Sequence, residues 1–310
     1  MDFDYDALSV LSAVVRGGSF EAAAKSMNVT QSAISQRIKQ LEQKFGAILV
    51  MRGRPCVATE EGVLLCRHLE EVQLLEHDLR EQMAARGKRR GTKAPASIRI
   101  SVNSDSLATW FPEALDRAAN ELNLRLEVIP EDQYFTADRL RSGDALAIVT
   151  SSPDTVPGCR SIELGVMEYM AVASPAFLER HLSGKLDLKS VARAPSIQFD
   201  RKDTLPIQWV ERAFGQAAQL SAHQMPSYEG HLQCCLQSIG WAMMPTTTVG
   251  PMVEAGQLTE LIPGVRLAMP LYWQCRANAS GTLKALNEVV TDVAASALIR
   301  SDKVTAERVV

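Results

Sequence analysis

The stretch FEAAAKSMNVTQSAISQRIKQLE, residues 20–42, decides the N-terminal part of the fold. Ser19 and Thr30 are good N-cap residues, and Asn28 tolerates the left-handed backbone of a tight turn, so the spacing predicts two short helices joined by a turn. The second helix carries apolar residues at steps of four and three, which predicts a buried stripe of Ile34, Ile38, Leu41 and Phe45. This arrangement is a helix-turn-helix, whose second helix is shaped to lie in the major groove of DNA.

The opposite side of the second helix is polar. Small hydroxyl and amide side chains on that side allow close approach and hydrogen bonds to base edges, whereas a lysine suits a phosphate. The alternative is an ordinary amphipathic helix with a solvated face, because short helix pairs are common.

The same segment closely resembles the N-terminal domain of LysR-type transcriptional regulators, with its FxxAAxxLxxxQSAxSxxIxxLE pattern. The residues that match are Phe20, Ala23, Ala24, Gln31, Ser32, Ala33, Ser35, Ile38, Leu41 and Glu42, followed by Gly46, Leu49, Arg52, Thr59 and Gly62. The resemblance implies a winged element with its tip at 52–55. The stretch from Arg52 to Thr59 is one residue shorter than the usual family spacing. The predicted DNA contacts are Thr30, Gln31, Ser32, Ser35, Gln36, Arg37, Lys39, Arg52 and Arg54.

The formal net charge of −3 is compatible with DNA binding once the charges are located. Between Thr30 and Arg54 there are five lysines and arginines against Glu42 alone. Phosphate attraction acts within about a Debye length of ~8–10 Å, so the local excess matters and the whole-chain charge does not.

The six cysteines show no CxxC or histidine-linked spacing, so we expect neither a metal nor a cofactor. Cys234 and Cys235 lie in an apolar stretch, which favours core filling over a redox switch. The acidic start, residues 1–6, does not resemble a signal peptide, and no apolar run approaches the ~20 residues that a membrane helix needs. We therefore expect a soluble, cytoplasmic protein.

Residues 60–83 predict one long helix without proline. One small winged domain cannot bury the apolar stripe of this long helix, so the stripe predicts a partner helix in a homodimer or homotetramer. The alternative is that the stripe packs against the same chain. In LysR regulators this helix dimerises the protein. The basic stretch 86–95, with glycine and proline, predicts a hinge. The stripe consists of Leu65, Leu69, Val72, Leu75, Leu79 and Met83.

After residue 96 the pattern changes to strands that alternate with helices. Strands are predicted at 98–102, 124–129, 146–149, 169–173, 196–199, 241–244 and 271–275, and helices at 107–120, 135–142 and 282–300. Such alternation predicts a mainly parallel sheet with helices on both faces. Ligands in these folds bind beyond the carboxyl ends of the strands.

This half resembles the two-lobed, periplasmic-binding-protein-like α/β effector domain of LysR regulators. The fold class is therefore α plus α/β: a winged helix-turn-helix (1–60), a linker helix (61–87), a hinge (88–96), lobe I (97–165 and 269–310) and lobe II (166–268). Residues 103–110 and 271–273 resemble the ArgP/LysG branch, which controls lysine and arginine exporters. The resemblance implies a promoter-binding regulator whose effector is a basic amino acid.

The residue chemistry is compatible with that effector. Ser104 and Ser106 fall at a strand-to-helix junction, where amide N–H groups favour an α-carboxylate. The cationic side chain of such an effector needs carboxylates, which acidic residues in loops supply; the alternative is that these acidic residues are simply solvated. Thr150 and Ser151 suit the polar head of the amino acid. For Glu229 a further alternative is that it caps a helix that begins near His231. Tyr272 and Trp273 line the cleft or belong to the core. The effector candidates are Ser104, Asp105, Ser106, Glu131, Asp132, Thr150, Ser151, Asp200, Glu229 and Tyr272.

Two other classes of function are alternatives. An enzyme is disfavoured because the chain has no GxSxG, GxxxxGK[ST] or HExxH motif. A nucleoid or replication-origin binding protein would share the DNA-binding segment but would not need an effector cleft. The expected partners are double-stranded promoter DNA, a basic amino acid and a second copy of the chain, with RNA polymerase as a further candidate.

Overall fold

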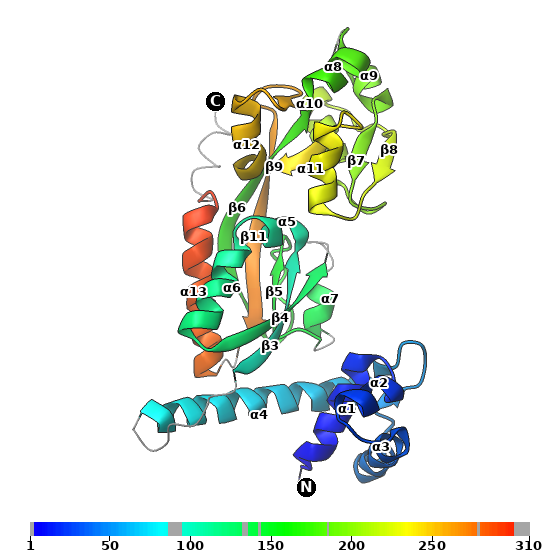
Figure 1. Cartoon of the computed structure of the whole chain (residues 1–310), viewed down its shortest axis with the longest axis vertical. Helices are drawn as coiled ribbons and strands as arrows, with labels where there is room; N and C mark the ends of the chain where they lie inside the picture. The colour runs from blue at the N-terminus through cyan, green and yellow to red at the C-terminus, as the bar shows by residue number, and fades with distance from the viewer. Residues whose placement is uncertain are drawn as a thin grey trace.

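A computed structural model of the chain describes residues 3–85, 95–131, 136–141, 144–184, 186–277 and 280–300. The N-terminal head lies at one end of the molecule, and two lobes follow it along the long axis (Figure 1). The head is built from three helices and a short antiparallel hairpin, namely α1 (Tyr5–Gly17), α2 (Phe20–Ser26), α3 (Gln31–Phe45), β1 (Val50–Met51) and β2 (Val57–Ala58).

A single helix, α4 (Glu60–Ala85), leads away from the head. Near its start Leu65 and Leu69 are buried in the core of the head. Further along, Leu75, Leu79 and Met83 are 58%, 57% and 53% exposed. The predicted stripe is therefore divided: its first part packs against the same chain, and its last part lies uncovered.

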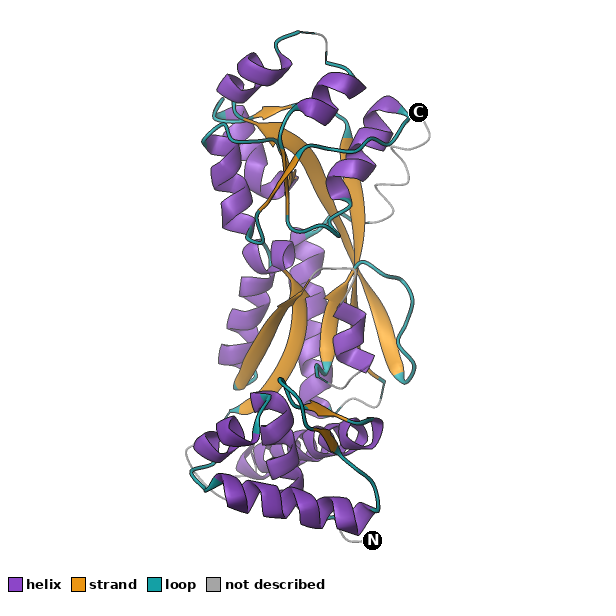
Figure 2. Cartoon of the chain, turned by 90° about the vertical axis from the view of Figure 1, so that its right-hand side faces the viewer, coloured by secondary structure: helices purple, strands orange, loops and turns teal. Residues whose placement is uncertain are grey.

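The remaining elements form the effector half. Lobe I, as used below, comprises β3 (Ala96–Asn103), α5 (Ser104–Ala108), α6 (Phe111–Glu121), β4 (Leu124–Glu131), α7 (Thr136–Arg141), β5 (Ala147–Thr150) and α13 (Gly281–Ala297). Lobe II comprises α8 (Pro175–Leu182), α9 (Leu188–Arg193), β7 (Ser196–Gln198), α10 (Leu205–Phe214), β8 (Ala222–Gln224), α11 (Tyr228–Leu236), β9 (Ala242–Pro245), α12 (Thr246–Glu254) and β10 (Thr259–Glu260). Two long strands, β6 (Cys159–Ala173) and β11 (Arg266–Arg276), run through both lobes (Figure 2).

The prediction of a mainly parallel sheet is wrong. In the seven-stranded sheet only β3 pairs in parallel, with β4 and β5, whereas β11 is antiparallel to β5 and β6, and β6 is antiparallel to β9 and β10. The physical reason is the length of β6 and β11: each continues from one lobe into the other, and they pair with each other antiparallel.

The single helix predicted over residues 107–120 is also wrong. The segment forms two helices, α5 and α6, with a break at Thr109 and Trp110. Pro112 occupies the first turn of α6, where a proline needs no N–H partner, and it disfavours a helix that continues from the preceding residues.

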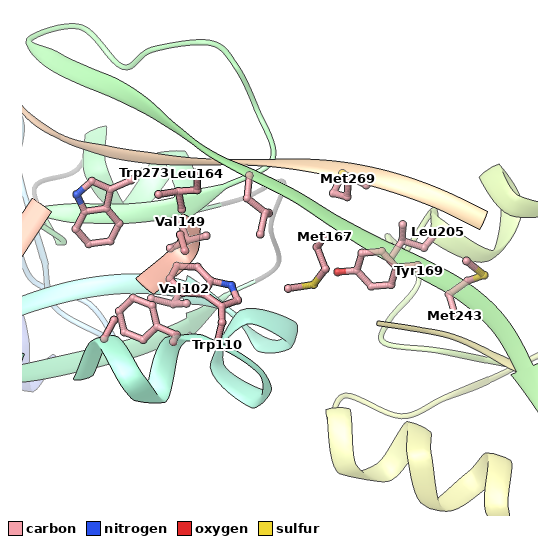
Figure 3. Close-up of a cluster of buried hydrophobic side chains, with 14 of the residues drawn as sticks. Val102, Trp110, Val149, Leu164, Met167, Tyr169, Leu205, Met243, Met269 and Trp273 are labelled. Carbon is pink, nitrogen blue, oxygen red and sulfur yellow. The ribbon is translucent and has the colours of Figure 1, made fainter. Parts of the chain in front are cut away.

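The main apolar core extends from lobe I into lobe II. Figure 3 shows Trp273 and Val149 at one end, and Tyr169, Leu205 and Met243 at the other. Trp273 is fully buried and its indole Nε1–H donates to Asn287 Oδ1 at 2.6 Å, so this residue belongs to the core and does not line the cleft.

The cysteines also belong to the packed interior or its margin. All six are free thiols, and Cys234 and Cys235 are buried in a cluster of lobe II. Burial raises the pKa of the Cys235 thiol to about 12. Because the thiolate is the reactive form, the finding favours core filling at this pair.

Within the described residues, no group of three histidine, cysteine, aspartate or glutamate side chains is placed to hold a metal ion. The helices in the same part of the chain include none that is long and apolar enough to cross a membrane.

Candidate functional site: a DNA-reading helix and an interlobe cleft

The second helix of the head, α3, is fixed at its start by a side-chain cap. Thr30 Oγ1 accepts from the backbone N–H of Ala33 at 3.2 Å and lies 2.9 Å from Ser32 Oγ. The turn before it has the predicted left-handed residue, because Asn28 has φ 53°. Ser19 caps α2 by accepting from Ala22 N at 3.1 Å. These contacts confirm the predicted helix-turn-helix.

The two faces of α3 differ as the sequence predicts. Ile34, Ile38 and Leu41 are at most 2% exposed and pack into the core of the head. On the other side Ser35 is half-buried, and the remaining polar candidates are exposed: Gln31, Ser32, Gln36, Arg37 and Lys39. An exposed row of amides, hydroxyls and cations on a rigid helix is suited to base edges and phosphates.

The β1–β2 hairpin places basic side chains beside this helix. Its base is anchored where Cys56 N donates to Gly18 O at 2.7 Å. The Arg52 guanidinium lies 5.1 Å from the centroid of the Phe20 ring, a cation–π contact that fixes it against the head. Arg54 is exposed at the tip. The predicted wing is therefore present, with Arg52 stacked on Phe20 at its base and Arg54 at its tip, both exposed.

A second candidate site lies where the strands of lobe I end. Asn103 is the last residue of β3 and is in register with Glu131, the last residue of β4. Thr150 ends β5 and is in register with Tyr272 of β11. Since β3 lies between β4 and β5, the structure brings these strand ends to one edge, where α5 begins at Ser104.

Two polar atoms at this edge are buried without a partner in the described part of the chain. They are Asn103 Oδ1, on a residue that is 3% exposed, and Ser106 Oγ, on a fully buried residue. Buried polar atoms are nearly always hydrogen-bonded in proteins, so an unpartnered pair indicates where a ligand or water fits. Thr150 and Ser151 are buried close by, and Thr150 Oγ1 accepts from Ser152 N at 3.2 Å.

Asp105 joins the two lobes. Its carboxylate Oδ2 accepts from the hydroxyl of Tyr169 at 2.6 Å. Tyr169 is fully buried on β6, at the point where β6 pairs with Pro245 of β9 in lobe II. The bond therefore connects the first turn of α5 in lobe I with a strand that continues into lobe II.

Further negative charge gathers at the start of α11. The pKa of Tyr228 is raised to about 12, mainly by burial and to a smaller extent by the charges of Asp105 and Glu229. The Tyr228 hydroxyl donates to Thr248 Oγ1 at 2.5 Å. Helices α5 and α11 contact each other, and each carries an acidic residue in its first turn, Asp105 and Glu229 respectively. Such a setting is suited to a cation.

The remaining candidates are less directly placed. Asp200 follows β7, and its Oδ1 accepts from the backbone N–H groups of Lys202 at 2.6 Å and Asp203 at 3.1 Å, which is a local turn. The side chain of Tyr272 is half-buried. Asp132 lies outside the described residues.

Glu229 does not cap a helix that begins near His231. Helix α11 begins at Tyr228, and its cap is Ser227, whose Oγ accepts from Gly230 N at 3.1 Å. Glu229 is exposed in the first turn and accepts from Gln233 Nε2 at 3.1 Å.

Sequence reasoning missed Tyr169, Tyr228 and Asn103. Tyr169 and Asp105 are separated by 64 positions, so no local pattern connects them. Asn103 carried a usable signal, because it directly follows the predicted strand 98–102 and immediately precedes Ser104.

The sequence matches two family descriptions. Residues 5–63 match "Bacterial regulatory helix-turn-helix protein, lysR family", and residues 93–295 match "LysR substrate binding domain". Together these segments contain both candidate sites, the first around α3 and the second between the lobes.

Relatives match over almost the full length. The HTH-type transcriptional regulator ArgP of Pseudomonas fluorescens is 37% identical over 300 residues, covering 97% of this chain and all of the relative. The HTH-type transcriptional regulator LysG of Mycobacterium tuberculosis is 38% identical over 296 residues, covering 96% of this chain and 95% of the relative.

Solved structures agree with the architecture. ArgP from Mycobacterium tuberculosis superposes with a TM-score of 0.79 at 37% identity and covers 97% of this chain and 100% of its own. Full-length LysG from Corynebacterium glutamicum with bound effector Arg has a TM-score of 0.71 at 32% identity and covers 96% and 100%. The chain therefore belongs to the LysR family of bacterial helix-turn-helix regulators, with its DNA-reading helix at α3 and its substrate-binding domain in the two lobes.

Proposed function

We propose that two copies of this chain bind an interrupted inverted repeat in a promoter, and that a basic amino acid, L-arginine or L-lysine, modulates this binding from the cleft between the lobes. The target is an amino-acid exporter gene. The observation that carries the effector assignment is the position of Asp105, a carboxylate at the boundary of both lobes.

The cleft offers complementary groups for both ends of such a ligand. Its carboxylate is suited to the start of α5 around Ser104, beside the unpartnered Asn103 and Ser106 atoms. Its cationic side chain is suited to Asp105, with Glu229 on the facing lobe. LysG from Corynebacterium glutamicum, 32% identical, was solved with arginine as its effector, and this supports the same ligand class here.

A second copy is proposed to cover the exposed face of α4. Leu75, Leu79 and Met83 follow one another at steps of four and are each more than half exposed. Pairing these faces would place two α3 helices on one DNA, at the spacing that an inverted repeat requires. A homodimer, or a homotetramer made of two such dimers, follows from this arrangement.

Ligand binding has to favour one arrangement of the lobes in order to alter the bound DNA. The Asp105–Tyr169 hydrogen bond provides such a difference, because a cation at Asp105 competes with the tyrosine hydroxyl for the same carboxylate. Closure on the ligand would then change the spacing of the heads. The relatives reported above are named as transcriptional regulators, and we propose that this chain likewise has no catalytic activity and acts on DNA in the cytoplasm.

Calorimetry with L-arginine, L-lysine and neutral L-glutamine tests the effector, and footprinting of the promoter of a neighbouring exporter gene, with and without each amino acid, tests the regulation. We expect heat with a basic amino acid alone and a footprint that changes when it is added. Absence of heat with both basic amino acids, together with an unchanged footprint, would contradict the proposal and favour an effector-independent nucleoid or replication-origin binding protein.

A further inference from the structure

Helix α4 has a second buried face besides the one in the head. Leu74 is 4% exposed and belongs to the core cluster of the effector half. Asp78 follows Leu74 one helical turn later and contacts the start of α13. This face lies about 100° around the helix from the exposed row of Leu75 and Leu79. Helix α4 is therefore docked on lobe I of its own chain along one side.

The contact of Asp78 is a helix cap supplied from another element. Its Oδ2 accepts from the backbone N–H of Gly281 at 2.6 Å. Its Oδ1 accepts from the backbone N–H of Thr282 at 2.9 Å and also from the Thr282 hydroxyl. These N–H groups belong to the first turn of α13, where a carboxylate is favoured by the helix dipole and by charge-assisted hydrogen bonds.

The sequence at this end of α13 leaves room for the carboxylate. A Cβ added at Gly281 would lie 3.2 Å from Asp78 Oδ2, tighter than an ordinary contact. The helix has its own cap at Ser280, which accepts from Leu283 N at 3.2 Å. Asp78 therefore accepts from the backbone N–H groups of α13 that the Ser280 cap does not pair, and it does so only while α4 stays docked on lobe I.

The far end of α13 reaches the strand that joins the lobes. After the helix, Ile299 forms an antiparallel bridge with Val166 of β6, with N–O distances of 2.8 and 3.0 Å. Figure 1 shows α13 running along lobe I, from α4 at its lower end to the lobe boundary at its upper end. One rigid helix thus contacts the lobe-joining strand at one end and the linker helix at the other.

We propose that Asp78 is a positioning residue, which fixes the linker helix to α13 and so makes the placement of the DNA-reading head depend on the arrangement of the lobes. The link to the effector rests on the proposed function. The link to the geometry of the bound DNA does not, because the cap is formed entirely by residues of the chain itself.

The test is the bend angle of promoter DNA, measured by circular permutation for wild type, Asp78→Asn and Glu76→Gln, with and without L-arginine. Asp78→Asn keeps the size of the side chain but presents an amide N–H to one of the donors. Glu76→Gln removes the same charge from the same helix at an exposed residue that pairs only locally with Arg80. Thr282→Ala perturbs the cap from the other side and serves if Asp78→Asn does not fold.

We expect Asp78→Asn and Thr282→Ala to change the bend without effector and to lose the arginine-dependent change, with the Kd for arginine within about twofold of wild type. Hydrogen exchange at the Gly281 and Thr282 amides should accelerate about tenfold. The Glu76→Gln variant should match wild type. A wild-type bend in Asp78→Asn, with unchanged exchange, would overturn the proposal. If wild type itself ignores arginine, the proposed effector is wrong, and the bend without effector still tests Asp78.

Discussion

The charge of Asp105 provides a quantitative test of the effector cleft. The substitution Asp105→Asn removes the negative charge but leaves an oxygen that can accept from the Tyr169 hydroxyl, so the hydrogen bond between the lobes is retained. A change in affinity can then be assigned to the lost charge. Asp154→Asn is the matched control, because Asp154 is exposed in the loop after β5 of the same lobe.

The magnitude follows from Coulomb's law. Two unit charges 4 Å apart interact by about 4 kcal/mol at an effective dielectric constant of about 20. Asp105 is half-buried and shares its carboxylate with Tyr169, so solvent screening and competition reduce this figure. We expect a loss of about 2 kcal/mol, which corresponds to an arginine Kd about 30-fold weaker.

Isothermal calorimetry of wild type and both variants checks this value. L-glutamine, which shares the amino-acid head but has no charge on its side chain, should show no difference between wild type and Asp105→Asn. An Asp105→Asn variant that binds arginine as tightly as wild type would refute the reasoning. An equal loss in Asp154→Asn would refute it too, because the effect would then come from the general field of lobe I.

The remaining predictions concern the head, the linker helix and lobe II. Lys39→Ala should weaken binding to all DNA sequences and reduce the slope of log Kd against log salt concentration by about 1. Gln36→Ala should instead relax the base preference and leave that slope unchanged. Titrations of cognate and scrambled duplexes at several salt concentrations measure both effects. Leu79→Glu should shift the protein toward monomer in sedimentation equilibrium, because a carboxylate in an apolar helix pair is unpaired. Burial lowers the pKa of His231 below 6.5, so the unfolded chain takes up a proton at a higher pH than the folded chain does. The stability of the folded protein therefore falls as the pH drops below about 6.5. In His231→Leu, the urea midpoints at pH 7.5 and pH 5.5 should differ less than they do in wild type.

The head was predictable because its determinants are local. Ser19, Asn28 and Thr30 act on backbone groups within three residues of themselves, and the apolar stripe of α3 needs only the helical repeat. The same local reasoning failed where long-range pairing decides the structure. The direction of β11 depends on β6, more than 90 positions away, and both strands pair antiparallel although strands and helices alternate along the chain.

The candidate cleft was partly predictable for the same reason. Ser104 and Ser106 were found from the junction of a strand and a helix, which is a local signal. Tyr169 was assigned only to a strand, because nothing near it in sequence indicates that its hydroxyl meets Asp105. On α4 the apolar pattern was read as one stripe, whereas Leu74 packs on lobe I and belongs to a second face. A helix that packs against several parts of the molecule has several buried faces, and a single helical repeat in the sequence cannot distinguish these faces.

Two glycines test how tightly α4 is fitted to the head. Gly62 lies in the first turn of α4, and a Cβ added there would be 2.1 Å from the carbonyl oxygen of Leu49, which already accepts from Thr59 N at 3.0 Å. Backbone cannot be moved as cheaply as a flexible side chain, so α4 or the strand after α3 has to shift. Gly250, inside α12 and followed by Pro251, is the control because an added Cβ meets no neighbouring element within 4 Å.

The two substitutions to alanine should therefore differ in size. Gly250→Ala should change the stability by less than about 1 kcal/mol, because the gain from alanine in a helix interior is opposed by Pro251, which disfavours a helical residue with a Cβ before it. Gly62→Ala receives the same benefit but should lose about 3 kcal/mol from overpacking, for a net destabilisation of about 2 kcal/mol. Urea unfolding of each variant measures both values. If Gly62→Ala were as stable as Gly250→Ala and bound DNA as wild type does, the close contact between α4 and the wing strand could not be what orients the linker helix against the head.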